Sequence, residues 1–128
     1  MTQKTTHGIS IRVETYYNGV QGILHQPEHS FAYRISIHNQ SEFPIQLLDR
    51  HWLIFDSMGF VREVKGEGVV GKQPIIEPNE QFHYISGASL KTDMGKMRGS
   101  YTMENLLNKT RFEVEIPEFE LIVPHKLN

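Results

Sequence analysis

The six-residue stretch GEGVVG, residues 66–71, is the pattern in this chain that most suggests chemistry. Its glycines, Gly66, Gly68 and Gly71, have the G-x-G-x-x-G spacing of the loop that holds a pyrophosphate in dinucleotide-binding folds. Such a loop works between a strand and the start of a helix, where backbone N–H groups and the helix dipole face the phosphate. The flanking residues therefore decide whether the stretch is a nucleotide site.

The residues after this stretch exclude a dinucleotide-binding turn. A strand is expected before it, but Lys-Gln-Pro-Ile-Ile-Glu-Pro follows at residues 72–78. Two prolines and two β-branched residues do not open an ordinary helix. Two interpretations remain: a glycine-rich connection between strands, or an anion or ligand site formed by a nest of backbone N–H groups. The candidate ligand or partner loop comprises Lys65, Gly66, Glu67, Gly68, Val69, Val70, Gly71 and Lys72.

Histidine, a common metal ligand, is frequent in this chain, with seven residues. His25 and His29 are four residues apart, a spacing that suits a metal site on a helix. Pro27 lies between them and indicates a loop or the start of a strand. Residues four apart on a strand lie roughly 13 Å apart, too far to share one ion. We therefore expect no metal site, and the absence of cysteine excludes disulfides.

Sequence signatures of catalysis are missing. The chain contains neither G-x-S-x-G nor H-E-x-x-H. Several carboxylates lie close together near the C-terminus, but alternation places them on a solvated face: Glu113, Glu115, Glu118 and Glu120. The sequence predicts a protein that is not an enzyme and has no cofactor.

Composition narrows the class of partner. The formal net charge of the 128 residues is −2, which is too weak a balance to favour nucleic acid or an acidic membrane surface. No apolar run approaches the ~20 residues needed to cross a bilayer. The first ten residues lack the apolar core of a signal peptide. We expect a cytoplasmic protein with no membrane insertion, and a homodimer stays open.

Alternation of apolar and polar residues predicts strands through most of the chain. The expected strands cover residues 9–14, 31–38, 43–64 as a hairpin, 78–86 and 111–123. Gly59 is expected at positive φ in the hairpin turn, and Pro117 marks an edge or a bulge. Only MENLLNKT, residues 103–110, offers a helical turn. Many short strands separated by turns predict an all-β, antiparallel β-sandwich.

Three side chains have competing interpretations, and a fourth has one structural interpretation. Trp52 is expected to pack between the sheets, the alternative being a ligand-stacking role. Arg50 and His51 begin a strand beside a turn, so they either make a structural ion pair or carbonyl bond, or take part in recognition. Tyr101 in GSYTM is similar to a tyrosine corner, whose hydroxyl bonds to the backbone.

Several segments together resemble the ApaG family. They are LLDRHWLIFDSMG, GEGVVGKQP, FHYISGASLKT, GKMRGSYTM and FEVEIPEFEL, in this order and spacing. The resemblance covers roughly residues 8 to 123. The family motif falls here on Arg50, His51, Trp52, Gly66, Gly68, Val69, Val70, Gly71, Gln73, Pro74, Ser86, Gly87, Gly99, Tyr101 and Met103.

The resemblance implies a fibronectin type III-like or immunoglobulin-like β-sandwich without enzymatic activity. It also implies an association with divalent cation homeostasis, for cobalt and magnesium, and a protein-binding role. Lys72 stands where the family commonly has Glu, and Asp93 where it commonly has Pro. The lysine weakens any proposal that the loop holds a cation and suits an anion.

These observations lead to a domain assignment and two hypotheses. We expect a flexible N-terminal tail over residues 1–6, one sandwich domain over residues 7–123, and a C-terminal tail over residues 124–128. The first hypothesis is a binding module that docks a protein partner through loops at one end. The second is a phosphate-ligand or cation-linked regulator that uses the loop from Gly66 to Gly71.

Overall fold

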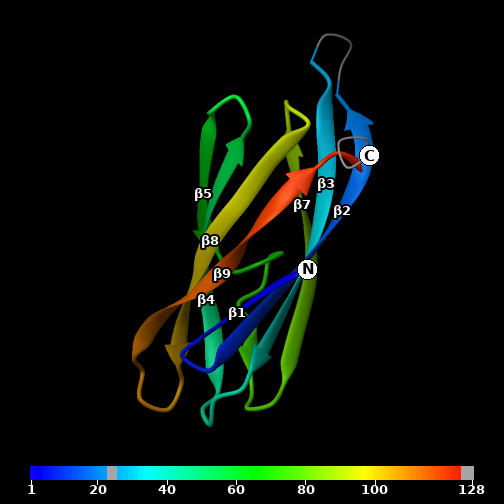
Figure 1. The fold of residues 1–128 in the computed structure, drawn as a ribbon. Helices are drawn as coiled ribbons and strands as arrows, with labels where there is room; N and C mark the ends of the chain where they lie inside the picture. Colours follow the sequence, from blue (N-terminus) through cyan, green and yellow to red (C-terminus); the bar gives the residue numbers. More distant parts are fainter. Residues whose placement is uncertain (23–25, 125–128) are drawn as a thin grey trace.

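The computed structural model describes residues 1–22 and 26–124, and these residues form an antiparallel β-sandwich (Figure 1). They contain no α-helix, and so no helix that could span a membrane. The strands are β1 (Thr2–Thr6), β2 (Ile9–Gln21), β3 (Glu28–Asn39), β4 (Ile45–Asp56), β5 (Val61–Glu67), β6 (Ile75–Ile76), β7 (Gln81–Leu90), β8 (Met94–Asn105) and β9 (Arg111–Ile122).

The strands form two sheets, and every pair within a sheet is antiparallel. Sheet A has the order β1-β2-β3-β7. Sheet B has the order β5-β4-β8-β9, with the short β6 also paired to β4. The predicted sandwich is confirmed.

The core lies between the sheets and follows from the period-two pattern. Inward side chains of the central strands are buried, and their neighbours face solvent. Trp52 is only 3% exposed and meets Tyr33 and Phe119 edge-on, with ring centroids 5.5 and 5.8 Å away. The prediction that Trp52 packs between the sheets is confirmed.

The N-terminal residues differ from the expected loose tail. Thr2–Thr6 form β1, which pairs with β2 from Thr2 opposite Val13 to Thr6 opposite Ile9. The residues TQKTT are polar, so they give no alternating pattern, but threonine suits a strand and the edge of sheet A supplies the backbone partners.

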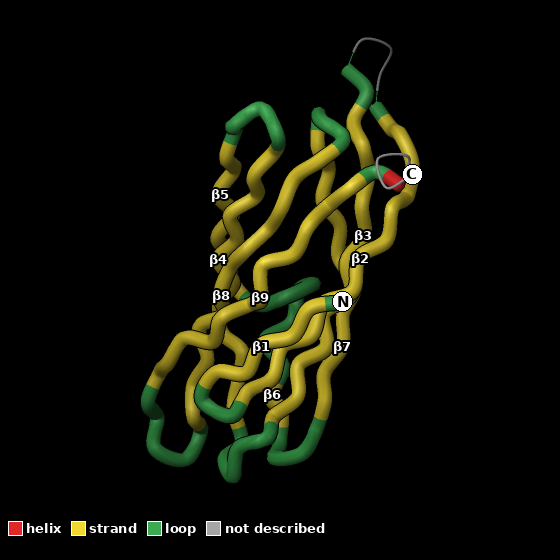
Figure 2. The backbone as a smooth tube through the Cα atoms, in the orientation of Figure 1, coloured by secondary structure: helices red, strands yellow, loops and turns green. Residues whose placement is uncertain are grey.

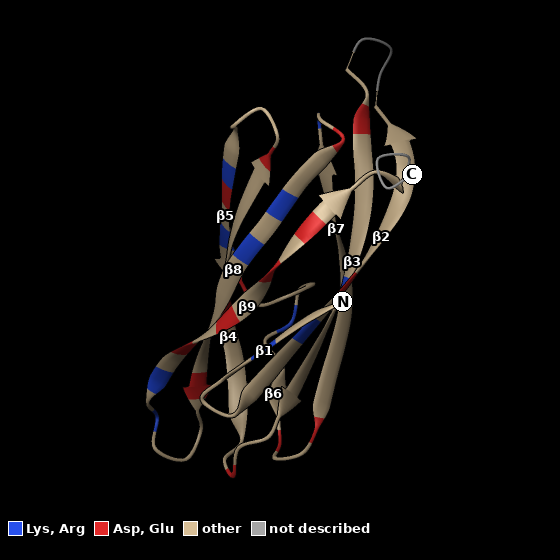
Figure 3. Cartoon of the chain, in the orientation of Figure 1, with Lys and Arg blue, Asp and Glu red and all other residues tan. Residues whose placement is uncertain are grey.

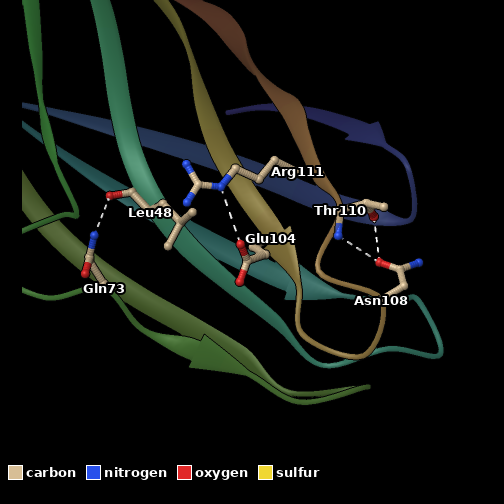
Figure 4. Close-up of polar contacts among 6 residues, drawn as sticks. All are labelled: Leu48, Gln73, Glu104, Asn108, Thr110 and Arg111. Atoms are coloured by element: carbon tan, nitrogen blue, oxygen red, sulfur yellow. Dashed lines mark hydrogen bonds and ion pairs between the residues drawn. The ribbon is translucent and has the colours of Figure 1, made fainter.

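The predicted helical turn at residues 103–110 is limited to one turn after β8, in which the N–H of Lys109 donates to Asn105 O at 2.8 Å, and no helix forms there. β8 continues through Met103 to Asn105, and a turn follows because the Asn105 side chain accepts hydrogen bonds from the backbone N–H groups of Leu107, at 3.0 Å, and Asn108, at 3.4 Å. Asn108 in turn accepts from the backbone and hydroxyl of Thr110 (Figure 4).

Tyr101 is fully buried, but it is not a tyrosine corner. Its hydroxyl bonds to the hydroxyl of Tyr84 across the two sheets, rather than to the backbone. The reason is its place in the centre of β8, where an inward side chain meets sheet A and not a connecting loop.

Gly59 and Pro117 fulfil their predicted roles. Gly59 has φ 90° in the turn between β4 and β5, where the Asp56 side chain accepts from the N–H groups of Met58 and Phe60. Pro117 lies in β9, an edge strand whose register with β8 shifts between Met97 and Gly99.

Candidate functional site

The candidate loop from Lys65 to Lys72, called the glycine loop below, leaves sheet B midway along β4 and not at an end of the sandwich. The last pair of β5 with β4 joins Glu67 to Asp49, and β6 resumes pairing at Ile45 and Gln46. The loop between them lies beside the middle of the molecule, whereas the other connections gather at its two ends (Figure 2). The glycine loop is therefore separate from the loops at the two ends of the sandwich, through which the first hypothesis has a partner dock.

Arg50 holds the base of the loop from the inside. Arg50 lies two and four residues before the buried Trp52 and Ile54 on β4, so it shares their face of the strand. Its half-buried side chain therefore points between the sheets. Its Nη1 donates to the backbone oxygen of Glu67 at 2.9 Å and of Gly68 at 3.0 Å. Of the interpretations open from sequence, the structure places Arg50 in a carbonyl bond.

Gly66 and Gly68 are required by the space around them. A Cβ on Gly66 would lie 2.8 Å from Arg50 Nη1, because the guanidinium lies over this residue. A Cβ on Gly68 would lie 2.1 Å from the carbonyl oxygen of Lys72, and Gly68 also has φ 62°. Both glycines let the chain pass close to its own polar groups.

The tip of the loop is a two-residue hairpin. The N–H of Val69 donates to Lys72 O at 2.8 Å, and the N–H of Lys72 donates to Val69 O at 2.9 Å. Val70 and Gly71 between them have φ 44° and 78°. Turns with two positive φ values favour Asn-Gly, so valine at this position is a backbone outlier. Val69 is buried, whereas Val70 is 54% exposed.

The loop does not have the geometry of a phosphate nest. Gly68 N–H donates to Leu48 O at 2.7 Å, and the N–H groups of Val69 and Lys72 bond to each other's carbonyls. Three of the backbone donors are thus engaged within the protein, and the chain continues into β6 without forming a helix. Converging free N–H groups, which an anion site needs, are not supplied by these residues.

Gln73 ties the end of the loop to β4. Its Nε2 donates to Leu48 O at 3.0 Å (Figure 4), and Gln46 Nε2 donates to Gln73 O at 3.0 Å. Leu48 lies at the β-bulge between Leu47 and Asp49, which exposes its carbonyl to the loop. The base of the loop is therefore fixed on both sides.

His51 and Lys65 lie on the outer face of sheet B, opposite each other in register. His51 Nε2 contacts Glu63 Oε2 at 2.8 Å. This hydrogen bond and the charge of Lys65 lower the pKa of Glu63. Lys72 is exposed at the tip. The predicted site residues thus lie in three places. Arg50 lies between the sheets, His51 and Lys65 lie on the outer face of sheet B, and Val70 and Lys72 lie at the exposed tip of the loop.

Three tyrosines lie near Arg50 inside the sandwich. Burial raises the pKa values of Tyr33, Tyr84 and Tyr101, and the charge of Arg50 opposes the rise only in part. Their hydroxyls stay neutral at physiological pH and act in hydrogen bonds, as between Tyr84 and Tyr101. This cluster suits packing and not proton transfer.

A cavity of about 300 Å³ was not anticipated from the sequence. It lies between the β4–β5 hairpin and the end of β7 and is lined by Glu28, Ile54, Asp56, Phe60, Val61, Arg62, Ser89, Leu90 and Lys91. Phe60 and Val61 are 66% and 52% exposed. The available signal was DSMGFV, which places large apolar residues at a turn that needs none.

Side chains of the types that can bind metal ions are scattered over the described ranges. Within residues 1–22 and 26–124, no three His, Asp or Glu side chains are placed to hold one ion. His25 lies outside the described residues. His29 Nδ1 is 2.9 Å from the hydroxyl of Tyr17.

Known proteins match this chain over nearly its whole length. The ApaG domain model matches residues 21–105. A protein named ApaG from Pseudomonas aeruginosa is 46% identical over 97% of this chain and 98% of its own. Another ApaG protein, from Methylobacterium radiotolerans, is 43% identical over 98% of this chain and 95% of its own.

Solved structures agree with these matches. A Bordetella pertussis protein named ApaA has a TM-score of 0.84 and 41% identity, covering 91% of this chain and 94% of its own. A second crystal structure, a structural genomics target, has a TM-score of 0.88 and 38% identity, covering 91% and 88% of the two chains. The chain therefore belongs to the ApaG domain family.

Proposed function

We propose that this chain is a non-enzymatic binding module of the cytoplasm whose glycine loop presents Val70 to a protein partner. The observation that carries the proposal is the combination of exposure and strain at Val70, which is 54% exposed at φ 44°. A β-branched residue in this region costs about 1 kcal/mol or more. Turn stability would favour asparagine or glycine, so valine serves another purpose.

The base of the loop supports this role. The side chains of Arg50 and Gln73 donate hydrogen bonds to backbone oxygens there, and the backbone N–H of Gly68 donates to another backbone oxygen. An apolar side chain on a rigid tip loses little conformational entropy on binding, which is what an interface anchor requires. The neutral, buried tyrosines behind Arg50 offer no acid–base pair, which favours binding over catalysis.

The family association with divalent cations fits an indirect role. The segment from Lys65 to Lys72 carries two lysines and one carboxylate, Glu67, so its charge does not favour a cation. We infer that any dependence on magnesium or cobalt acts through the partner. The alternative, a phosphate-bearing ligand at the same loop, has the two lysines in its favour and the engaged N–H groups against it.

A capture experiment tests the proposal. Wild type, Val70→Asn and Leu107→Ser would be immobilised and exposed to lysate of the source cell, with and without added magnesium, and bound proteins identified by mass spectrometry. Leu107 is a matched control because it is 67% exposed in the turn after β8. We expect one set of proteins to be retained by wild type and Leu107→Ser and lost by Val70→Asn. Equal recovery by all three would contradict the proposal.

The alternative has its own measurement. Calorimetric titration with ATP, GTP and NAD should show no binding by the wild-type protein. Micromolar binding that disappears on Lys65→Gln and Lys72→Gln would instead favour the phosphate ligand.

A further inference from the structure

The edge strands of the sandwich differ in how they are protected. An edge strand exposes unpaired N–H and C=O groups that can pair with another chain. β5 carries four charged residues along its seven, namely Arg62, Glu63, Lys65 and Glu67. β9 carries five charges and the bulge at Pro117, and β1 is only five residues long. These features discourage pairing at three edges.

β7 lacks all of these protections. Its ten residues, QFHYISGASL, include no Pro and no Lys, Arg, Asp or Glu, so the strand has neither blue nor red in Figure 3. Its register with β3 runs without a shift from His29 opposite Leu90 to His38 opposite Gln81. Among the described residues β3 is the only strand paired to it, so its other side is a long and regular edge with no charged residue of its own, contacted by Arg62 of β5 at Ser89.

The hydrogen bonds at the start of β7 fix which of its residues direct backbone groups toward the free edge. Asn39 N–H donates to Glu80 O at 3.0 Å, so the pair Asn39–Glu80 is of the hydrogen-bonded kind and these alternate along the strands. Odd-numbered residues of β7 therefore direct N–H and C=O away from β3. Independently, the carbonyl of Ser89 accepts from Arg62 of sheet B. Both observations assign Ile85, 62% exposed, to the free edge.

The cavity adjoins one end of this edge. Ser89, Leu90 and Lys91 line one wall, and Phe60 and Val61 line the other. A strand added beside β7 would direct alternate side chains into the space between the sheets. A side chain paired with Leu90, whose own side chain is buried between the sheets, would reach the cavity and cover Phe60 and Val61.

We propose that the free edge of β7 binds an extended, uncharged segment of a protein partner by strand addition, with one large apolar side chain in the adjoining cavity. Backbone hydrogen bonds would supply affinity and the cavity would supply specificity. A second copy of this chain fits less well. Its own β7 has Tyr84 and Leu90 buried in its own core, at 7% and 3% exposure, so a β7–β7 dimer leaves the cavity empty.

This inference rests on the proposed binding function but names a different surface from Val70. Arg62 now satisfies the Ser89 carbonyl, and an incoming strand would take its place. Because Ile85 and Val70 lie on separate elements, substitutions at each can be tested independently.

Peptide selection tests the proposal directly. A displayed library of random peptides about twelve residues long, enough to span β7, would be selected against the full chain, and enriched peptides synthesised. We expect uncharged sequences with one large apolar residue. On binding, amide hydrogen exchange should slow at His83, Ile85 and Gly87, and much less at the residues between them.

Variants then separate edge pairing from side-chain contact. Ile85→Pro removes one free-edge N–H without touching the bonds to β3, and should weaken binding about tenfold or more. Ile85→Thr keeps the N–H and should change affinity by less than about threefold. Phe60→Ser should weaken binding by removing one cavity wall. If Ile85→Pro unfolds, the hydrogen-exchange pattern of wild type still decides.

Each other outcome would overturn the inference. Selection of no peptide, or of peptides that protect the glycine loop and leave β7 exchange unchanged, would reject the β7 site; the second result would leave the proposed function standing. A concentration-dependent dimer that Ile85→Pro dissociates would show a second copy to be the occupant.

Discussion

The base and the tip of the glycine loop look alike in sequence but obey different constraints. At the base, Gly66 and Gly68 face polar atoms of Arg50 and Lys72, so a side chain has no room. At the tip, a Cβ on Gly71 would have no heavy atom within 4 Å, and Val70 is exposed. At the base, the lack of space for a side chain requires glycine. At the tip, only the positive φ values restrict which residue fits. The same motif therefore combines a structural half with a half that is free to serve binding.

The largest expected effect is that of Gly68→Val. Its Cβ would lie 2.1 Å from a backbone oxygen at φ 62°, so both collision and strain contribute. We expect a loss of about 3 kcal/mol or more in the free energy of unfolding. Gly71→Val is the matched control, with φ 78° but open space, and should lose about 1–2 kcal/mol. Urea unfolding measures both, and equal losses would remove the distinction between base and tip.

Gly66→Ala should have a smaller effect that depends on Arg50. The new methyl group would meet the guanidinium, which can move but then loses its bonds to Glu67 O and Gly68 O. We expect a loss of about 1–2 kcal/mol in wild type and little in an Arg50→Ala background. A double-mutant cycle by urea unfolding gives the coupling. Strict additivity would show that the two residues act separately.

The sequence predicted the strands with clear alternation better than those without it. β8 was not assigned from its residues, because Gly95 and Gly99 interrupt the apolar pattern. In the structure these glycines allow close contact with β4, since a Cβ would lie 2.4 Å from Phe55 O and 2.2 Å from His51 O. This requirement comes from packing between strands distant in sequence, which local periodicity does not encode.

The candidate site was only partly predictable for a related reason. The failure of the dinucleotide motif followed from Pro74 and Pro78, which are local signals. The inward direction of Arg50 depends on the bulge between Leu47 and Asp49, which shifts the phase of β4 by one residue. The cavity is lined by residues of four strands, β3 and β7 of sheet A and β4 and β5 of sheet B, so it has no local signature beyond the exposed Phe60.

Val70→Asn should change stability in the opposite direction from the base variants. Asparagine tolerates φ 44° better than valine, and little packing is lost because Val70 is 54% exposed. We expect a gain of about 0.5–1 kcal/mol in the free energy of unfolding, alongside the loss of partner binding proposed above. Destabilisation by this substitution would mean that Val70 packs against the protein and is not a free tip.

The smallest effect is expected on the outer side of the same base, where His51 contacts Glu63. The folded-state pKa of Glu63 lies below its ordinary value of 4.5, first because of the hydrogen bond to His51 and then because of the charge of Lys65. A lowered carboxyl pKa contributes stability above the unfolded-state value, and this contribution is lost as pH falls through the folded-state pKa. Glu63→Gln should therefore unfold more easily than wild type near neutral pH, with the difference shrinking in acid. Both groups are exposed, so the effect should be small. Urea unfolding of both proteins from pH 7 down through the ordinary carboxyl pKa of 4.5 gives the comparison. Lys65→Gln should reduce this pH-dependent difference less than loss of the His51 hydrogen bond would, because the charge of Lys65 is the smaller cause of the lowered Glu63 pKa. A difference between Glu63→Gln and wild type that stays constant with pH would show that the ionised carboxylate adds no stability.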